Sequence, residues 1–212
     1  MTNLEYHNPV LLKETVDGLN IKPDGVYVDV TFGGGGHSRE ILSRLGESGK
    51  LLAFDQDPDA KQNVIDDKRF TLIPENFRYL KQFLRFYGCK KVDGVLGDFG
   101  VSSHQFDVAE RGFSTRFDSR LDMRMNQRDK ISAYEVVNEY AEADLRSVFC
   151  QYGELKNAPK LARLIVQERA ENPIETGDHL KELLAPFLFK GKEFKILAQI
   201  YQAIRIEVNQ EI

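Results

Sequence analysis

The stretch that decides the fold is Val26-Tyr27-Val28-Asp29-Val30-Thr31-Phe32-Gly33-Gly34-Gly35-Gly36-His37-Ser38. Its first five residues are mostly β-branched or aromatic, which predicts a short buried strand. Four successive glycines suit neither a strand nor a helix, because glycine costs roughly 1 kcal/mol in the interior of either. They suit a tight turn in which backbone approaches a ligand, and a helical pattern over residues 38–45 follows directly. We therefore expect a strand, a ligand-binding turn and a helix in succession.

The same alternation of strand and helix continues along the first half of the chain. Short apolar runs recur at Lys50–Phe54, Phe70–Ile73 and residues 92–96, and residues 80–87 have helical spacing. This alternation predicts an α/β fold in which a mostly parallel, Rossmann-like sheet carries helices on both faces. Acidic residues at the strand ends would then gather along one edge of the sheet, where such folds bind ligands.

The second half of the chain lacks β-rich runs and has apolar residues at helical spacing. The predicted helices cover residues 131–149, 158–170, 179–187 and 195–208. We predict an inserted helical lobe over residues 105–193. Residues 1–104 and 194–212 are assigned to the sheet domain.

The composition is that of an ordinary globular protein. Of 212 residues, 42% are hydrophobic and 29% charged, and no run reaches the roughly 20 apolar residues that span a bilayer. The start of the chain lacks the layout of a secretion signal, so we expect a cytoplasmic protein without a membrane partner. The net charge of −4 excludes coating of nucleic acid by charge alone, but not a local basic face.

Cysteine and histidine usage predicts neither a disulfide framework nor a metal centre. Cys89 and Cys150 lie far apart in the sequence, and reduced thiols are expected. The four histidines show no metal-ligand spacing with these cysteines. We therefore expect no bound metal.

An acid follows the glycine turn at the spacing of a nucleoside-binding site. Asp55 ends the second predicted strand about 20 residues further on, where a carboxylate can accept hydrogen bonds from a ribose. The layout suits dinucleotides and S-adenosylmethionine. Ser38 occupies the position where a dinucleotide site has a third glycine or alanine for close helix packing, and no lysine follows the glycines as in a phosphate-binding loop. S-adenosylmethionine is favoured, with a nicotinamide dehydrogenase as a distant alternative.

Several separated segments together resemble the ribosomal RNA small-subunit methyltransferase H (MraW) family. They begin with His-Asn-Pro-Val-Leu-Leu-Lys-Glu (residues 7–14) and the glycine turn (31–38), followed by Asp-Gln-Asp-Pro (55–58) and Asp-Gly-Val-Leu-Gly-Asp-Phe-Gly-Val-Ser-Ser (93–103). Further on come Ala-Glu-Arg-Gly-Phe-Ser (109–114), Leu-Asp-Met-Arg-Met (121–125) and Gln-Ala-Ile-Arg-Ile-Glu-Val-Asn (202–209). Matches in this order over essentially the whole chain are far more specific than a glycine turn alone.

The resemblance implies a methyltransferase that uses S-adenosylmethionine to methylate N4 of a cytidine in the decoding region of 16S ribosomal RNA. The RNA would be recognised within the 30S subunit, and the helical lobe would bind it. Carried over by position, the implied cofactor contacts are Gly35, Gly36, His37, Asp55, Phe77, Asp98 and Gln105.

The chain departs from the family pattern in three places. Gly97 and Phe99 flank Asp98 where leucines are expected, and His104 replaces an expected proline. The family also continues beyond Asn209 with a helix, a strand and a His-Ser-Leu-Glu-Asp type segment, so we expect a truncated chain. The fourth strand would then have an unpaired edge, which predicts a homodimer formed through that edge.

Asp98 is the candidate catalytic residue. The amine of cytidine is a poor nucleophile, because its lone pair is shared with the ring, and a carboxylate nearby would stabilise positive charge that develops on nitrogen. Contact with the cofactor is the competing role for Asp98, and capping of the turn after the strand is the structural alternative. The two prolines typical of amino-methyltransferases are absent here, so the cytidine assignment depends on the resemblance.

Other polar and aromatic residues have both functional and structural interpretations. Ser102 and Ser103 could contact RNA or cap a turn or helix, and the Gly-x-Ser-x-Gly pattern of a serine nucleophile is missing. His37 could be a general base, although positioning of the loop or cofactor is favoured. Phe77 could pack on the adenine or belong to the core.

A basic segment over residues 111–130 is the candidate RNA-binding surface. Arg111, Arg116 and Arg124 are its proposed phosphate contacts, with Phe113 and Phe117 positioned to stack on unpaired bases. Three aspartates in the same segment leave open a self-paired, solvated surface. For the whole chain, the alternatives are a non-catalytic module that binds cofactor or RNA, and an amino-methyltransferase that acts on DNA or a small molecule.

Overall fold

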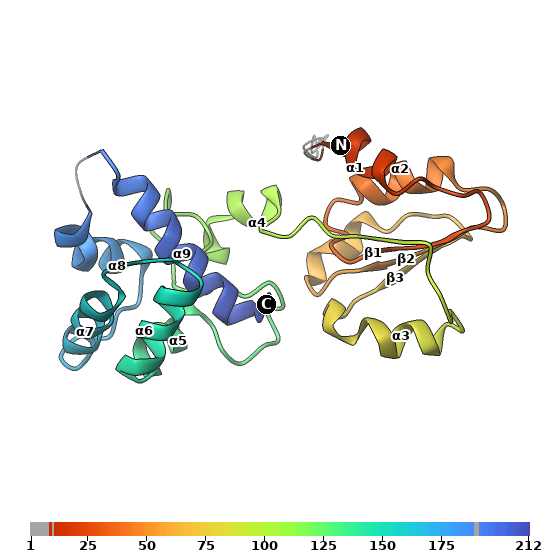
Figure 1. Ribbon diagram of the computed structural model, residues 1–212. Coiled ribbons are helices and arrows are strands. Elements are labelled where there is room, and N and C mark those ends of the chain that lie inside the picture. The colour runs from red at the N-terminus through yellow and green to blue at the C-terminus, as the bar shows by residue number, and fades with distance from the viewer. Residues whose placement is uncertain (1–8, 10, 189–190) are drawn as a thin grey trace. The chain divides into compact units, whose positions relative to one another are not determined.

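The structure is a computed structural model that describes residues 9, 11–188 and 191–212. The chain forms two compact units, residues 1–102 and residues 103–212 (Figure 1). The first contains a sheet with helices, and the second contains helices. Each unit is described by itself.

A four-stranded parallel sheet is the centre of the first unit, as predicted. Its order is β3-β2-β1-β4, and every neighbouring pair is parallel. The strands are β1 (Val26–Asp29), β2 (Lys50–Phe54), β3 (Phe70–Ile73) and β4 (Gly94–Leu96). Within the described residues β4 is an edge strand, and the homodimer expected through this edge stays a prediction.

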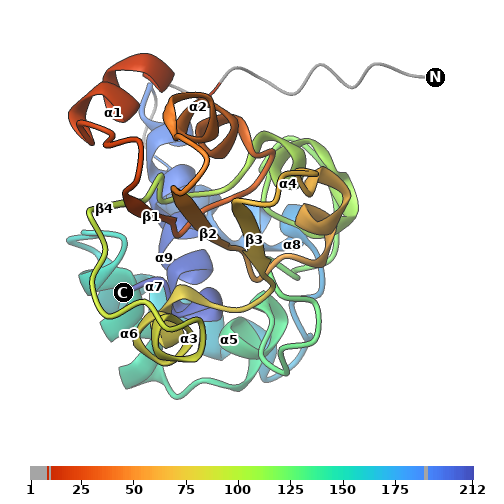
Figure 2. The same ribbon diagram turned by 90° about the vertical axis from the view of Figure 1, so that its right-hand side faces the viewer.

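Helices cover both faces of the sheet because the strand side chains alternate. Tyr27 and Leu51 face a core that they share with Ile41 and Leu42 of α2 (Gly36–Arg44), and α1 (Leu12–Gly18) adds Val16 to this core. Val28, Leu52 and Phe54 face the opposite side, where residues of α3 (Leu80–Phe86) pack on them (Figure 2). The predicted α/β sandwich is confirmed.

Short elements in the first unit have little sequence signal. The helix α1 was not predicted, because Val16 is its single buried residue and no apolar periodicity marks it. Two 3₁₀ turns, η1 (Pro58–Asn63) and η2 (Phe77–Tyr79), follow β2 and β3. In both, an Asx side chain accepts a hydrogen bond from a backbone N–H at the start of the turn: Asp57 in η1 and Asn76 in η2.

The second unit is helical, as predicted. Its elements are α4 (Ser103–Asp107), η3 (Ala109–Arg111), α5 (Ala133–Glu139), α6 (Glu142–Gln151), α7 (Ala158–Arg169), α8 (Gly177–Leu184), η4 (Ala185–Phe187) and α9 (Glu193–Asn209). The single helix expected over residues 131–149 is two, because Tyr140 and Ala141 are extended between α5 and α6. The Tyr140 hydroxyl donates a hydrogen bond to the Glu207 carboxylate on α9 at 2.8 Å.

The predicted domain boundary is wrong for the last helix. Residues 194–212 were assigned to the sheet domain, but α9 belongs to the second unit and packs on α5 and α6. At the end of α9, Asn209 also holds the loop that precedes α5: its Oδ1 accepts from the Met125 N–H at 2.6 Å, and its Nδ2 donates to the Met123 carbonyl at 2.7 Å. Both bonds are made by a side chain that is only 4% exposed. The apolar spacing predicted the helix α9, but it could not predict which elements pack on the apolar face of α9.

No helix within the described ranges is both long enough and apolar enough to cross a bilayer.

Replacement of Asn209 by alanine should loosen the loop that it holds. Asn209→Ala leaves the Met125 N–H and Met123 carbonyl without their partner, which costs about 1–3 kcal/mol for buried polar groups. Hydrogen exchange followed by mass spectrometry should show faster exchange over residues 123–126. Gln202→Ala removes an exposed bond from the same helix to the Tyr152 carbonyl and is the control. Equal protection of residues 123–126 in both variants would contradict this role of Asn209.

Candidate functional site

The carboxyl ends of β1, β2 and β4 meet where the strand order reverses. The register places Ala53 on one side of Asp29 and Leu96 on the other. The chain that leaves β1 is held between them, because Val30 N–H donates to the Leu96 carbonyl at 2.9 Å and Phe32 N–H to the Phe54 carbonyl at 3.0 Å. Ligands of open α/β sheets bind at this kind of switch point. The glycine loop therefore starts at the expected ligand site of the fold.

The glycine loop has a geometry that side chains would obstruct. Gly35 has φ of 77°, and a Cβ atom there would lie 2.9 Å from the ring of Phe32. A Cβ atom on Gly36 would lie 2.3 Å from the ring of Pro9. Gly35 is the N-cap of α2, so the turn presents the amino end of this helix at the switch point. The predicted succession of strand, turn and helix is confirmed.

Asp55 holds the glycine loop from the end of β2. Its Oδ2 accepts from the Gly33 N–H at 2.7 Å, and its Oδ1 accepts from the Asp57 N–H at 2.8 Å. Asn63 in η1 supports the same loop by donating to the Gly33 carbonyl at 3.0 Å. Burial raises the pKa of Asp55 to about 6, although both backbone hydrogen bonds act to lower it. The glycine turn and its acid, predicted as parts of one site, are in direct contact.

Asp29 is a second carboxylate in this site and is fully buried; it is one of the strand-end acids expected to gather at this edge of the sheet, although no specific contact was predicted for it. Its Oδ2 accepts from the Ser38 hydroxyl on α2 at 2.7 Å, and its Oδ1 accepts from the Thr31 N–H at 3.0 Å. Burial raises the pKa of Asp29, and these hydrogen bonds oppose that rise. The signal in the sequence is an acid at the end of a buried strand, directly before the glycines. Asp29 thus fixes the turn to the helix that follows it.

Thr31 connects the glycine loop to the end of β4. Its hydroxyl oxygen accepts a hydrogen bond from the Asp98 N–H at 2.7 Å. The backbone of Asp98 is therefore tied to the loop, while its side chain is exposed. The structure brings Asp55 and Asp98 to the two sides of one turn, through bonds to Gly33 and Thr31 respectively.

Two phenylalanines pair beside the strand ends. Phe77 in η2 lies 5.6 Å from Phe99, centroid to centroid, with the rings tilted by 61°. Phe99 is 66% exposed, whereas Phe77 is partly buried and packs against the core that includes Val28 and Phe54. Sequence reasoning had treated Phe99 only as a departure from a family pattern. The two rings meet because the turn after β3 lies beside the turn after β4. A local sequence pattern does not predict this adjacency.

His37 is the second residue of α2 and is buried, with 5% exposure. Its Nε2 has no hydrogen-bond partner within the part of the chain that the structure describes. A buried nitrogen without a partner is costly, so a bound polar group would satisfy it.

The other predicted contacts lie at or beyond the boundary between the units. Ser102 closes the first unit, Ser103 opens α4, and Gln105 is buried within α4. Because Gln105 belongs to the second unit, its role as a cofactor contact stays a prediction. The RNA contacts expected of Ser102 and Ser103 also stay predictions. Ser103 is the first residue of α4, which fits the alternative that it caps a helix.

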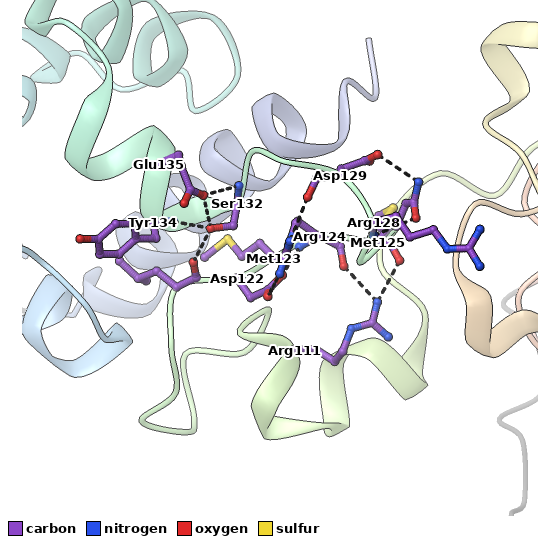
Figure 3. A network of polar contacts seen from close by, with 12 residues as sticks. Arg111, Asp122, Met123, Arg124, Met125, Arg128, Asp129, Ser132, Tyr134 and Glu135 are labelled. Atoms are coloured by element: carbon purple, nitrogen blue, oxygen red, sulfur yellow. Dashed lines mark hydrogen bonds and ion pairs between the residues drawn. The ribbon is translucent and has the colours of Figure 1, made fainter.

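Two of the predicted RNA-binding arginines bind the lobe itself (Figure 3). Arg111 is 4% exposed, and its Nη2 donates to the carbonyls of Arg124 and Met125 at 3.0 and 3.1 Å. Arg124 donates to both carboxylate oxygens of Asp122, at 2.9 and 2.7 Å, and to the Asp129 carbonyl. These two side chains are therefore engaged within the lobe, as expected if the charges of this segment pair with one another, and they are not part of the proposed RNA-binding surface.

Among the described residues no group of three or more acidic, histidine or cysteine side chains could hold a metal ion.

Comparison with known proteins finds one family. The sequence model of the MraW methylase family matches residues 5–212. A protein of Christiangramia forsetii named ribosomal RNA small subunit methyltransferase H is 76% identical over all of this chain, which spans 70% of that protein. Proteins of the same name from Flavobacterium johnsoniae and Bacteroides fragilis are 70% and 59% identical, over 100% and 98% of this chain and 70% and 68% of their own lengths.

Among solved structures, a candidate methyltransferase from an antibiotic biosynthesis pathway of Anabaena variabilis matches with a TM-score of 0.35 at 17% identity. The match covers 64% of this chain and 53% of that one.

The raised pKa of Asp55 should make stability depend on pH. The folded state binds the Asp55 proton more tightly than the unfolded state does, so its contribution to stability declines as pH rises from about 4 to about 6. The free energy of unfolding of the wild type relative to Asp55→Asn should fall over this window. The fall should be about 1.4 kcal/mol for each pH unit that separates the pKa of the folded state from that of the unfolded state. Urea denaturation at several pH values measures the difference.

Asp67 is the control of opposite sign. The Arg69 guanidinium holds the pKa of Asp67 at about 2, so its contribution is present above about pH 4 and is lost as pH falls towards 2. The free energy of unfolding of the wild type relative to Asp67→Asn should therefore rise with pH between about 2 and 4. A difference between wild type and Asp55→Asn that stays constant from pH 4 to 7 would show that the Asp55 carboxyl is not held in this way.

Proposed function

Because the chain belongs to the MraW methylase family, we propose that it transfers a methyl group from S-adenosylmethionine to the N4 amine of a cytidine in 16S ribosomal RNA. The substrate would be the RNA within the 30S subunit, in the cytoplasm. Methyl transfer is the activity class of the family, and the relatives quoted above carry a ribosomal RNA methyltransferase name. The RNA position and base are our proposal.

The contact between the glycine loop and Asp55 is the observation that carries this proposal. The Gly33 N–H bonds the carboxylate of Asp55, so backbone free of side chains lies directly beside an acid that can accept hydrogen bonds from a ribose. An ionised carboxylate has about four acceptor positions, and the two backbone N–H groups occupy two of them. Asp55 can therefore hold the loop and ribose hydroxyls together.

The remaining residues fit the same cofactor. The clash that a Cβ atom would meet at Gly35 and Gly36 leaves backbone as the lining of the site. His37 offers a buried nitrogen that no described residue bonds, and Phe77 offers an aromatic face for adenine, with Phe99 as its neighbour. We propose Gly35, Gly36, His37, Asp55, Phe77 and Asp98 as cofactor contacts; Gln105 is proposed as a further contact on the family resemblance alone.

The task left for the protein is to orient the amine and to stabilise its charge. S-adenosylmethionine supplies a methyl group that is already electrophilic. As the N4 lone pair forms the bond to carbon, positive charge develops on nitrogen, and a nearby carboxylate lowers the energy of that state. We propose Asp98 for this role in addition to its cofactor contact, because Thr31 anchors its backbone beside the loop while its carboxylate stays exposed. The target base must leave its stack to reach this carboxylate.

Methyl transfer to unmodified 30S particles tests the proposed function. Label from the methyl group of the cofactor should appear in 16S RNA, and mass spectrometry of nucleosides should identify N4-methylcytidine. Asp98→Ala should lower the rate by about tenfold or more, since charge-stabilising groups contribute at least this much to catalysis. Asp66→Ala removes an exposed aspartate outside the site and should leave the rate unchanged.

Three results would contradict the proposal. Label on DNA or on a small molecule in place of 16S RNA would assign another amine as substrate. Binding of S-adenosylhomocysteine without methyl transfer would indicate a non-catalytic module. An unaltered rate in Asp98→Ala would remove this residue from the mechanism.

A further inference from the structure

Three side chains of the second unit form an aromatic–guanidinium stack at the surface. The Cζ atom of Arg116 lies 5.0 Å from the ring centroid of Phe106 on α4 and 5.4 Å from that of Phe117. Phe106 is 37% exposed, and the Arg116 side chain is 56% exposed. We call Phe106, Arg116 and Phe117 the stacking cluster. Sequence spacing did not connect Phe106 to it, because the loop between residues 107 and 116 has to fold back on α4.

The guanidinium of this cluster is held in place by neighbours. Its Nε lies 3.3 Å from the Ser114 hydroxyl, which also accepts from the Arg116 N–H at 3.2 Å. Its Nη2 donates to Asp107 Oδ1 at 2.8 Å. Ser114 is only 3% exposed and is a fixed support, whereas Asp107 is 68% exposed. An ion pair this open to water is weak, so a competing anion can take the place of Asp107.

The backbone that carries Arg116 and Phe117 is anchored on α8. The Lys181 ammonium donates to the Thr115 carbonyl at 3.1 Å, and the Gly177 N–H donates to the Ser119 carbonyl at 2.9 Å. These bonds lie on either side of residues 116–118. The stacking cluster is therefore built on a supported loop, which reduces the entropy that a ligand must remove on binding.

Phe113, the other aromatic residue expected to stack on bases, is buried in the lobe. It is 5% exposed and packs under Arg111, with the guanidinium carbon 5.8 Å from its ring centroid. Arg111 and Arg124 also make their contacts inside the lobe. Of the three arginines predicted to bind phosphate, Arg116 is the one whose side chain is exposed.

We infer that the stacking cluster binds one unpaired nucleotide of the RNA substrate, with the base on the exposed face of Phe106 and its phosphate on Arg116 in place of Asp107. Aromatic faces stack on any base, and a guanidinium binds phosphate by geometry as well as by charge. The local charge favours RNA, because the exposed charged side chains of residues 111–130 are four basic ones and one acidic one: Arg116, Arg120, Arg128, Lys130 and Asp118. This inference rests on the proposed function and adds a subsite that the reacting base does not occupy.

Binding of a short single-stranded RNA to the full chain tests the subsite. A fluorescein-labelled oligonucleotide of mixed sequence, titrated in the presence of S-adenosylhomocysteine, reports the Kd by anisotropy. Phe106→Ala should raise the Kd about tenfold, within the range of one lost base stack. Phe106→Tyr keeps the aromatic face and should stay within about twofold of the wild type. Asp107→Asn removes the competing carboxylate and should lower the Kd.

Phe194→Ala is the matched control, because Phe194 on α9 is 87% exposed and lies outside the stacking cluster. It should leave the Kd unchanged. Phe106→Tyr and Asp107→Asn keep the test valid if Phe106→Ala does not fold, because neither removes an aromatic ring.

The outcomes separate this inference from the proposed function. Unchanged RNA binding in Phe106→Ala and Asp107→Asn, with methyl transfer to 16S RNA intact, overturns the subsite alone. Failure of the wild type both to bind RNA and to methylate it overturns the proposed function and the subsite with it. Weaker binding of Phe106→Ala to 30S particles but not to naked RNA would assign the stacking cluster to a protein partner and overturn the RNA subsite.

Discussion

Two carboxylates hold the glycine loop, the buried Asp29 and the half-buried Asp55, and the site depends on them. Asp55 bonds the Gly33 amide from the end of β2, while Asp29 bonds Thr31 and Ser38 from the end of β1. Each carboxylate is largely removed from water, which raises its pKa and makes its backbone and hydroxyl donors necessary. Acids at the ends of two neighbouring strands thus hold the loop: Asp29 bonds Thr31 and Ser38, and Asp55 bonds Gly33.

This arrangement explains why four glycines are tolerated in a loop that must be rigid. Glycine has more backbone freedom to lose than any other residue, so an unsupported run would be mobile. Here the contacts with Asp29, Asp55 and Asn63 remove that freedom, while the absent side chains leave backbone exposed to a ligand. Thr31 extends the same support to Asp98, so that the ends of three adjacent strands act as one unit.

Local sequence patterns predicted the sheet well and the long-range contacts poorly. Short continuous apolar runs placed all four strands, because a strand between two helical layers needs apolar side chains on both faces. The same reasoning missed α1, which buries one residue, and it extended one helix through Tyr140, where the chain turns. The placement of α9, the pairing of Phe77 with Phe99 and the stacking of Phe106 on Arg116 all depend on residues distant in sequence.

The arginines of residues 111–130 show how composition can mislead about binding. A basic segment is expected to face RNA, yet burial and pairing engage Arg111 and Arg124 inside the lobe, where they hold the loop of Met123 and Met125. The three aspartates in the segment were the signal for this outcome. Arg116 differs in its geometry, since its guanidinium lies over the rings of both Phe106 and Phe117 and its acidic partner Asp107 is exposed.

The central claim is that the glycine loop, Asp55 and Asp98 bind one S-adenosylmethionine together. Titration of isotope-labelled protein with S-adenosylhomocysteine, followed by amide NMR, tests it most directly. The account predicts that the amide signals of Gly33, Gly35, His37, Asp55 and Asp98 all move along one binding curve with a single Kd. Changes confined to one of these strand ends, or separate curves for Asp55 and Asp98, would contradict it.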